Sequence, residues 1–169
     1  MAAQTCISCR SQKVSLECES CHEPLCRDCK QFLREGTFSF LAKLPDELSF
    51  TNYCALCFST HVDPALTAYE ENMELARKAY FFFKTQKRHL PVLKRARVQT
   101  KIESCEDRDE TILRLAFFAV TEGYNAVIEA EVHSEKIRMG VYQTTRWHGV
   151  GVGAQVDQVK LDRSEHEDS

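Results

Sequence analysis

The stretch CESCHEPLCRDC (residues 18–29) places four cysteines within twelve positions. A CxxC pair brings two thiols to one side of a tight turn, which supplies half of the ligands of a tetrahedral zinc ion. Eight of the nine cysteines form four such pairs: Cys6/Cys9, Cys18/Cys21, Cys26/Cys29 and Cys54/Cys57. One isolated pair would also suit a thioredoxin-like redox site, whereas four neighbouring pairs favour metal binding. The sequence therefore predicts two zinc ions per chain, each bound by four cysteines.

The spacing of the four pairs leaves two groupings open. Eight residues separate the first pair from the second, four separate the second from the third, and twenty-four separate the third from the fourth. Sequential grouping would combine residues 6/9/18/21 and residues 26/29/54/57. Interleaved grouping would combine the first pair with the third and the second pair with the fourth.

The order of the pairs, CxxC, spacer, CxxCx4CxxC, spacer, CxxC, resembles the FYVE-type cross-brace zinc finger over about residues 4–62. The segment Cys54-Ala-Leu-Cys57-Phe58 resembles the closing knuckle of that family. The resemblance implies the interleaved grouping, with site 1 formed by Cys6, Cys9, Cys26 and Cys29 and site 2 formed by Cys18, Cys21, Cys54 and Cys57. Because eight cysteines complete both sites, we expect His22 and His61 to lie outside them. Residues 1–62 would form this first domain.

The charges around the cysteines differ from those of FYVE domains that bind phosphoinositides. Those domains carry a basic, histidine-rich run near the third cysteine, where this chain has Val14-Ser-Leu-Glu17 and the acidic neighbours Glu19 and Glu23. Phosphate recognition needs Arg or Lys, and carboxylates repel phosphate. We therefore expect an interaction module that does not bind phosphoinositides. Its core is expected from the apolar residues between the knuckles, namely Phe32, Leu33, Phe38, Phe40, Leu41, Leu44 and Phe50.

A linker helix is expected in residues 63–90. Asp63 followed by Pro64 is typical of a helix start, and apolar residues recur at steps of three and four up to the aromatic run Tyr80–Phe83. This helix, over residues 63–88, would pack on both domains or mediate self-association. Residues 77–101 carry nine basic side chains and no acidic one. They could form a nucleic-acid surface, but the formal net charge of −3 for the whole chain argues against nucleic-acid binding.

Residues 91–160 show the pattern of a second domain. Alternation from Ala96 to Ile102 predicts a strand, and a helix capped near Asp107 should end at Gly123. Two further strands should follow, with a turn at Ser134–Lys136, and the acidic tail 161–169 should be disordered. The predicted fold class is therefore α+β: a small zinc-stabilised cross-brace finger, a linker helix, and a β-α-β-β antiparallel sheet covered on one side by one helix.

The β-α-β-β order over about residues 92–160 resembles dodecin, a small flavin-storage protein. It also resembles the small bacterial proteins labelled putative heavy-metal-binding domains, chiefly through the segment Gly123-Tyr-Asn-Ala-Val-Ile128. The dodecin resemblance implies a closed homo-oligomer and an aromatic ligand at the subunit interface. Tyr124 would take the place of the stacking Trp, and Gln143, within Tyr142-Gln143-Thr144, would bond the flavin ring. Because Tyr is smaller than Trp, flavin remains the alternative to a purely structural role.

The sequence thus indicates a non-enzymatic, zinc-binding protein, for which we expect a bacterial and cytoplasmic origin. No signal peptide and no run of eighteen apolar residues is present, and disulfides are rare in reducing compartments. The zinc finger would bind an unidentified protein partner, and the second domain would form a homo-oligomer. Cys105, the one cysteine outside the pairs, is expected to be buried or inert.

Overall fold

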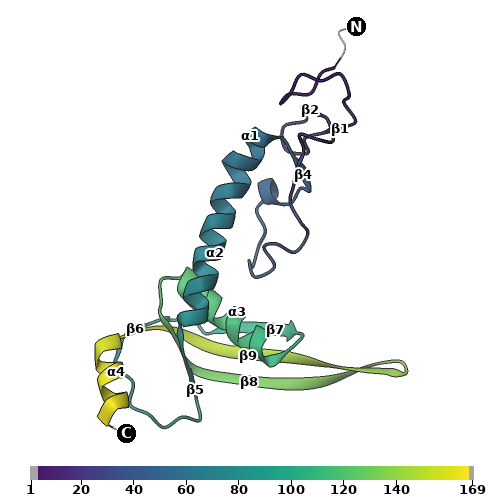
Figure 1. Cartoon of the computed structure of the whole chain (residues 1–169). Coiled ribbons are helices and arrows are strands. Elements are labelled where there is room, and N and C mark those ends of the chain that lie inside the picture. The colour runs from purple at the N-terminus through teal and green to yellow at the C-terminus, as the bar shows by residue number, and fades with distance from the viewer. Residues whose placement is uncertain (1–3, 168–169) are drawn as a thin grey trace. The chain divides into compact units, whose positions relative to one another are not determined.

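The computed structural model describes residues 4–167, which form two compact units (Figure 1). The first unit is Met1–Glu70 and the second is Glu71–Ser169. The boundary between them falls within helix α2 (Asp63–Lys78). Buried side chains cluster separately in the two units, so each unit has its own core.

The first unit contains only short regular elements before α2. Strand β1 (Leu16–Glu17) pairs with β2 (Pro24–Leu25), and β3 (Gln31–Phe32) pairs with β4 (Asn52–Tyr53), both antiparallel. The 3-10 helix η1 (Asp46–Leu48), the α1 turn (Ala55–Cys57) and the π-helical turn η2 (Phe58–Val62) precede α2. Two-residue strands contribute few ladder hydrogen bonds, so side-chain clusters must hold this unit together.

Tyr53 lies at the centre of the first core and is fully buried. Its hydroxyl donates to the carbonyl oxygen of Glu47 (2.9 Å) and accepts from the N–H of Phe50 (3.2 Å). Leu33 and Phe38 are buried as predicted, whereas Phe32 and Leu44 are 58% and 41% exposed. The core therefore uses only part of the apolar segment between the knuckles, and Tyr53 completes it.

The second unit is a five-stranded mixed sheet with helix α3 lying across it (Figure 1). The strands run in the order β5-β8-β9-β6, and β7 also pairs with β9. The elements are β5 (Tyr80–Phe83), β6 (Val92–Arg95), β7 (Thr100–Cys105), α3 (Arg108–Thr121), β8 (Ala126–Met139), β9 (Tyr142–Val156) and α4 (Gln158–Glu167). The predicted β-α-β-β order is present as β7-α3-β8-β9, within a larger sheet.

Helix α3 begins and ends where the sequence predicts. The Asp107 side chain accepts the N–H of Glu110 (2.7 Å), as an N-cap does. At the other end Gly123 has φ 87°. The N–H of Gly123 donates to the carbonyl oxygen of Val120 (3.0 Å), and the N–H of Tyr124 donates to the carbonyl oxygen of Ala119 (2.9 Å). These two bonds form a Schellman motif, which requires the left-handed conformation that glycine adopts easily.

Glycines in β9 leave room for side chains of α3 and of β8 that pack closely against the strand. A Cβ at Gly149 would lie 2.6 Å from Cγ2 of Thr111, and a Cβ at Gly151 would lie 2.5 Å from Cγ1 of Val127. Successive side chains of a strand point to opposite faces. Val152 and Ala154 therefore face away from α3, where they form a cluster with Ile128.

The expected helix over residues 63–88 is wrong beyond Lys78, because the aromatic run forms strand β5. This strand pairs in parallel with β8, so the sheet is mixed and not antiparallel throughout. Tyr80 and Phe82 stack on one face with ring centroids 6.3 Å apart, and Phe81 and Phe83 meet on the other at 5.2 Å. In a strand, each of these aromatic pairs packs together on its own face of the sheet. Aromatic residues also favour strands.

Two further expectations about the sheet are corrected. The turn of the long hairpin lies at Gly140–Val141 and not at Ser134–Lys136, because β8 continues to Met139 opposite Tyr142. Gly140 has φ 65°, which suits the first position of a two-residue hairpin turn. The strand expected from Ala96 to Ile102 is present only from Thr100, where β7 begins, because β6 ends at Arg95 and residues 96–99 belong to neither strand.

The second face of the sheet is covered in part, and the expected disordered tail forms helix α4. Leu161 of α4 is fully buried against Ala126 and Val156, with Phe82 and Leu90 packed against the same cluster. Burial of this leucine explains why the charged segment is ordered. The last two residues of the predicted tail lie outside the described residues, as do the first three of the chain.

Candidate metal centres

The first two knuckles share one backbone conformation, repeated twelve residues apart. The N–H of Arg10 bonds the Cys6 carbonyl (2.9 Å), and the N–H of His22 bonds the Cys18 carbonyl (2.8 Å). Arg10 and His22 both have φ 62°. This left-handed residue closes each turn so that the N–H groups of the knuckle point toward the sulfur of its first cysteine.

The third and fourth knuckles are built differently. In the third knuckle, the N–H of Cys29 donates a hydrogen bond to the Cys26 carbonyl (3.3 Å) and closes a turn. Cys54 is the N-cap of α1, and its sulfur accepts the N–H of Cys57 (3.4 Å). Each cluster described below combines one left-handed knuckle with one knuckle of this second group.

Backbone pairing brings separated knuckles together. The N–H of Ile7 bonds the carbonyl of Pro24 (2.9 Å), which places the first knuckle beside the chain entering the third. The N–H of Glu19 bonds the carbonyl of Asn52 (3.0 Å), which places the second knuckle beside the chain entering the fourth. The chain thereby groups the first knuckle with the third and the second with the fourth.

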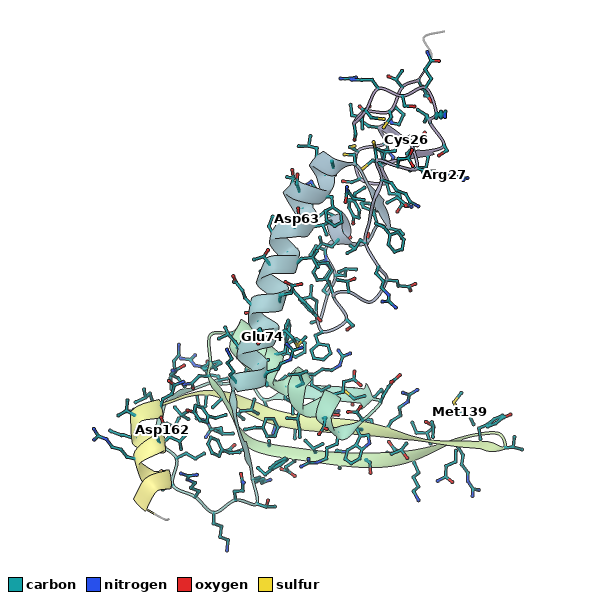
Figure 2. All side chains as sticks on the ribbon, in the orientation of Figure 1. Cys26, Arg27, Asp63, Glu74, Met139 and Asp162 are labelled. Carbon is teal, nitrogen blue, oxygen red and sulfur yellow. The ribbon has the colours of Figure 1, made fainter. Side chains whose placement is uncertain are left out.

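The sulfur atoms form two clusters of four, Cys6/Cys9/Cys26/Cys29 and Cys18/Cys21/Cys54/Cys57. Within each cluster all four sulfurs lie within 4.8 Å of one another. Figure 2 shows sulfur atoms gathered beside Cys26. Cys9 and Cys26 are 3.7 Å apart, and Cys21 and Cys54 are 3.8 Å apart. These are the groupings that the FYVE resemblance implies.

These distances fit a tetrahedral ion. With Zn–S bonds of about 2.3 Å, sulfurs at the corners of a tetrahedron lie about 3.8 Å apart. A disulfide would need about 2.05 Å, and all nine cysteines are free thiols. Cys6 and Cys18 are fully buried, while Cys9 and Cys21 are exposed. Both clusters therefore have the donor set, spacing and partial burial of structural zinc sites.

The two clusters each contain an easily ionised thiol. Backbone N–H groups, that of Cys9 first, lower the pKa of Cys6 to about 6. Burial acts to raise the pKa of Cys18, but the N–H groups of Cys21, Cys54 and Ser20 outweigh it and lower the value to about 7. Thiolates are the form that binds zinc, so these two sulfurs are prepared for a cation.

Each cluster also contains a thiol that retains its proton strongly. Contact with the Cys9 and Cys26 thiols raises the pKa of Cys29 to about 12. Burial, followed by contacts with neighbouring thiols, raises the pKa of Cys21 to about 12. Four thiolates packed together repel one another, and a divalent cation at their centre would remove that repulsion and displace the remaining protons.

Glu19 links the second knuckle to the chain that enters the fourth, and the sequence gives no sign of this role. Its carboxylate accepts the N–H of Thr51 (2.9 Å) and the side-chain amide of Asn52 (2.8 Å). The Thr51 bond, followed by the Asn52 bond, lowers the pKa of Glu19. Because these partners lie more than thirty residues away, no local pattern marks this link between the second knuckle and β4.

The other candidate ligands lie outside both clusters. His22 and His61 belong to neither thiol group, and in the described part of the chain only cysteines form such groups. Cys105 is buried at the end of β7, with 3% of its surface exposed, as expected for an inert thiol. His133 stacks on His148 across the β8–β9 hairpin, with ring centroids 5.4 Å apart, and among residues 4–167 this pair has no third ligand of a metal cluster.

The structure separates the two residues predicted to contact flavin. The ring of Tyr124 lies beside Gly153, with Lys94 Nζ 6.0 Å from its centroid. Gln143 pairs with Arg138 near the tip of the hairpin. Gly153 and Gln143 are ten positions apart along β9, a distance of roughly 33 Å along a strand. One chain does not bring Tyr124 and Gln143 together, so the predicted flavin site would need residues from two copies.

The basic segment 77–101 is partly neutralised by carboxylates. Arg77 pairs with Glu74, Lys84 with Glu131 (2.6 Å), Arg95 with Glu129 (3.0 Å) and Lys101 with Glu103 (2.7 Å). These acidic partners lie outside the segment in the sequence. In the fold they offset part of its positive charge. A continuous phosphate-binding surface is correspondingly less favoured.

Comparisons with protein-family models, with curated proteins and with solved structures found no match to this chain. Within residues 4–167, no helix has the length and apolar character needed to cross a membrane. Functional inference therefore rests on the two thiol clusters and on the surfaces of the two units.

Proposed function

We propose that residues 4–62 form a FYVE-like, cross-brace double zinc finger that holds two structural zinc ions. The observation that carries this proposal is the pair of four-thiol clusters, in each of which all sulfurs lie within 4.8 Å of one another. Cys6, Cys9, Cys26 and Cys29 bind one ion, and Cys18, Cys21, Cys54 and Cys57 bind the other. Their alternating order along the chain supports the cross-brace arrangement.

The zinc ions serve folding and not catalysis in this proposal. Four protein thiolates fill the tetrahedral coordination of zinc and leave no position for water or substrate, which is typical of structural sites. The finger is then a rigid, non-enzymatic module for binding a protein partner. Its acidic neighbours Glu17, Glu19 and Glu23 favour a partner other than a phosphoinositide.

Elemental analysis and X-ray absorption of the purified protein test this assignment. Two zinc ions per chain and a shell of four sulfurs at about 2.3 Å are expected. One zinc or none, or a shell that contains nitrogen or oxygen ligands, would overturn it. The histidine variants His22→Ala and His61→Ala serve as controls and should leave both the zinc content and the sulfur shell unchanged.

We further propose that the second unit forms a homo-oligomer through the outer part of the β8–β9 hairpin. β5 pairs with β8 only as far as Ala130, and β7 pairs with β9 only as far as Trp147. Beyond them residues 134–146 form a two-stranded ribbon ending near Met139 (Figure 2). Val141 and Tyr142 at its tip are 94% and 78% exposed. Exposed edges and apolar tips of this kind favour association.

Sedimentation velocity at tens of micromolar, where an interface of standard size is filled, tests the oligomer. The wild-type protein should sediment as a dimer or larger, and the double variant Val141→Ser/Tyr142→Ser should sediment as a monomer. Val159→Ser, which removes another exposed apolar side chain, is the matched control and should leave the assembly intact. A wild-type monomer would refute the proposal.

A further inference from the structure

A cavity of about 580 Å³ lies on the sheet face opposite α3. Phe82, Leu90 and Ile128 form part of its wall and belong to the apolar cluster of that face. Val92, at the start of β6, adds an apolar side chain that is 37% exposed. Pockets that bind small molecules measure about 300–1,000 Å³ and are lined mostly by apolar side chains. The cavity therefore has the size and the apolar wall of a ligand site, and it lies wholly within the second unit.

Contacts with α4 hold the wall of this cavity in place. Phe82 and Leu90 also pack against the cluster that contains the fully buried Leu161 of α4. Arg88 donates to Oγ of Ser164 (2.8 Å), which ties the segment between β5 and β6 to the same helix. The wall is thus fixed before any ligand binds, as is usual for small-molecule sites.

The cations that line the cavity are already engaged by other parts of the protein. Lys84 pairs with Glu131 (2.6 Å), and the Arg95 guanidinium binds both oxygens of the Glu129 carboxylate (3.1 and 3.0 Å). Arg88 holds α4 through the bond described above. A charged ligand would have to displace one of these partners, and burial of a charge without a partner is costly. The cavity therefore favours a neutral ligand.

The backbone at Glu129 places its carboxylate for this pairing. Glu129 has φ 51°, in the left-handed region, and lies at the β-bulge between Ile128 and Glu131. Bulges redirect side chains and recur beside binding sites. Here the bulge directs the carboxylate to Arg95, so the charge of that arginine is neutralised where it lines the cavity.

Gln86 provides a hydrogen-bond donor at the same cavity. Its side-chain oxygen accepts the N–H of Phe83 (2.8 Å), which orients the amide group. Among residues 4–167 the NH₂ group of that amide has no hydrogen-bond partner. An amide NH₂ donates to acceptors such as carbonyl oxygens. A ligand with one acceptor and an apolar body would match this donor and the wall.

We propose that this cavity binds a neutral, largely apolar small molecule that carries a hydrogen-bond acceptor such as a carbonyl oxygen. Its apolar body packs against Phe82, Leu90, Val92 and Ile128, and its acceptor bonds the NH₂ group of Gln86. The site lies within one chain and is separate from both thiol clusters and from the flavin site predicted at the subunit interface.

Titration of the zinc-loaded, full-length protein with four probes of similar shape tests the proposal: 2-acetylnaphthalene, 2-isopropenylnaphthalene, 2-naphthoate and 2-naphthylmethylammonium. NMR chemical shifts should change for residues 82–92 and 128–129. The ketone should bind about tenfold or more tightly than either ion, because each ion would lose water without gaining a partner. The isopropenyl compound lacks the acceptor, so it should bind about fivefold more weakly than the ketone, the loss expected for one hydrogen bond.

Variants with matched controls locate the binding. Val92→Ser should weaken both neutral probes about threefold or more because it removes part of the apolar wall, whereas Val98→Ser, at an exposed valine outside the lining, should not. Gln86→Glu keeps the acceptor for the Phe83 N–H and removes the NH₂ group. The ketone should then lose its advantage over the isopropenyl compound, and it should keep that advantage in Gln99→Glu, outside the lining.

Three results would overturn the proposed site: an ion that binds as tightly as the ketone, chemical-shift changes confined to other parts of the protein, or affinities unaffected by Val92→Ser. A ketone that keeps its full advantage in Gln86→Glu would overturn the hydrogen bond assigned to Gln86.

Discussion

At the scale of single residues, two residues adopt a backbone conformation that only glycine adopts without cost. Arg10 and His22 occupy equivalent positions in the first two knuckles, both with φ 62°. The left-handed conformation costs a residue other than glycine about 1–2 kcal/mol. Their N–H groups nevertheless close the two turns, so the knuckle geometry outweighs that cost.

His22→Gly should therefore raise the free energy of unfolding of the zinc-loaded protein by up to about 1 kcal/mol relative to His22→Ala. Both variants should retain two zinc ions, since His22 lies outside the thiol clusters. Chemical denaturation of the two variants provides the comparison. A glycine variant less stable than the alanine variant, or loss of a zinc ion from either, would show that the His22 side chain has another role.

Zinc binding should release protons and weaken as the pH falls. The raised pKa values of Cys21 and Cys29, both about 12, mean that each metal-free cluster carries at least one proton at pH 7. Zinc must displace that proton, so its affinity rises with pH. Calorimetric titrations in buffers of different ionisation enthalpy should detect at least one proton released per zinc at pH 7. A binding enthalpy independent of the buffer would contradict this expectation.

The sequence reveals the ligands of the site but not their supports. Eight cysteines in CxxC pairs are visible at once because ligand spacing is local. The resemblance to FYVE fingers adds the grouping, which spacing alone leaves open. The bonds from Glu19 to Thr51 and Asn52 join segments far apart in the chain, and no composition or periodicity marks them.

At the scale of elements, the close contact between α3 and β9 depends on Gly149, where there is no room for a side chain. The nearest atom to a Cβ at Gly149 would be Cγ2 of the buried Thr111, at 2.6 Å. Thr111 is held in place because its hydroxyl donates to the Asp107 carbonyl (2.9 Å). The Thr111 methyl group therefore has little freedom to rotate away from a new Cβ at Gly149.

Gly149→Ala should destabilise the second unit by about 1–3 kcal/mol, the usual cost of overpacking. Thr111→Ser removes the methyl group that the new Cβ would meet and keeps the hydroxyl. The double variant should consequently recover part of the loss made by Gly149→Ala. Thermal unfolding of the two single variants and the double variant gives the coupling energy. Additive effects would contradict the close contact.

Local patterns predict some elements and miss others for a physical reason. The caps at Asp107 and Gly123 bound α3 because capping depends on neighbouring residues. The aromatic strand β5 was predicted as helix because its pairing partner, β8, begins more than forty residues later. Helix α4 was predicted as disordered because its order depends on the burial of Leu161. That burial is a tertiary contact, which no local pattern shows.

At the scale of the whole molecule, the two units owe their stability to different interactions. Cysteines make up much of the first core, and structural zinc contributes on the order of 10 kcal/mol or more to small fingers. The second unit has its own sheet and apolar clusters. Metal should therefore matter to one unit only.

Removal of zinc with a strong chelator should unfold the first unit and leave the second folded. Hydrogen exchange measured by mass spectrometry should show faster exchange at knuckle amides such as those of Cys6 and Cys18, and unchanged protection in β8 and β9. Readdition of zinc should restore the first unit. Loss of protection in β9 on chelation would show that the two units are not independent.

Zinc stoichiometry of two double variants tests the central claim, two interleaved four-cysteine sites, most directly. Cys9→Ser/Cys29→Ser removes two thiols from one cluster, and Cys9→Ser/Cys21→Ser removes one from each. After mild chelation, native mass spectrometry of the full-length protein should find one zinc ion on the first variant and none on the second. The reverse result, none on the first and one on the second, would mean sequential sites and would contradict the account.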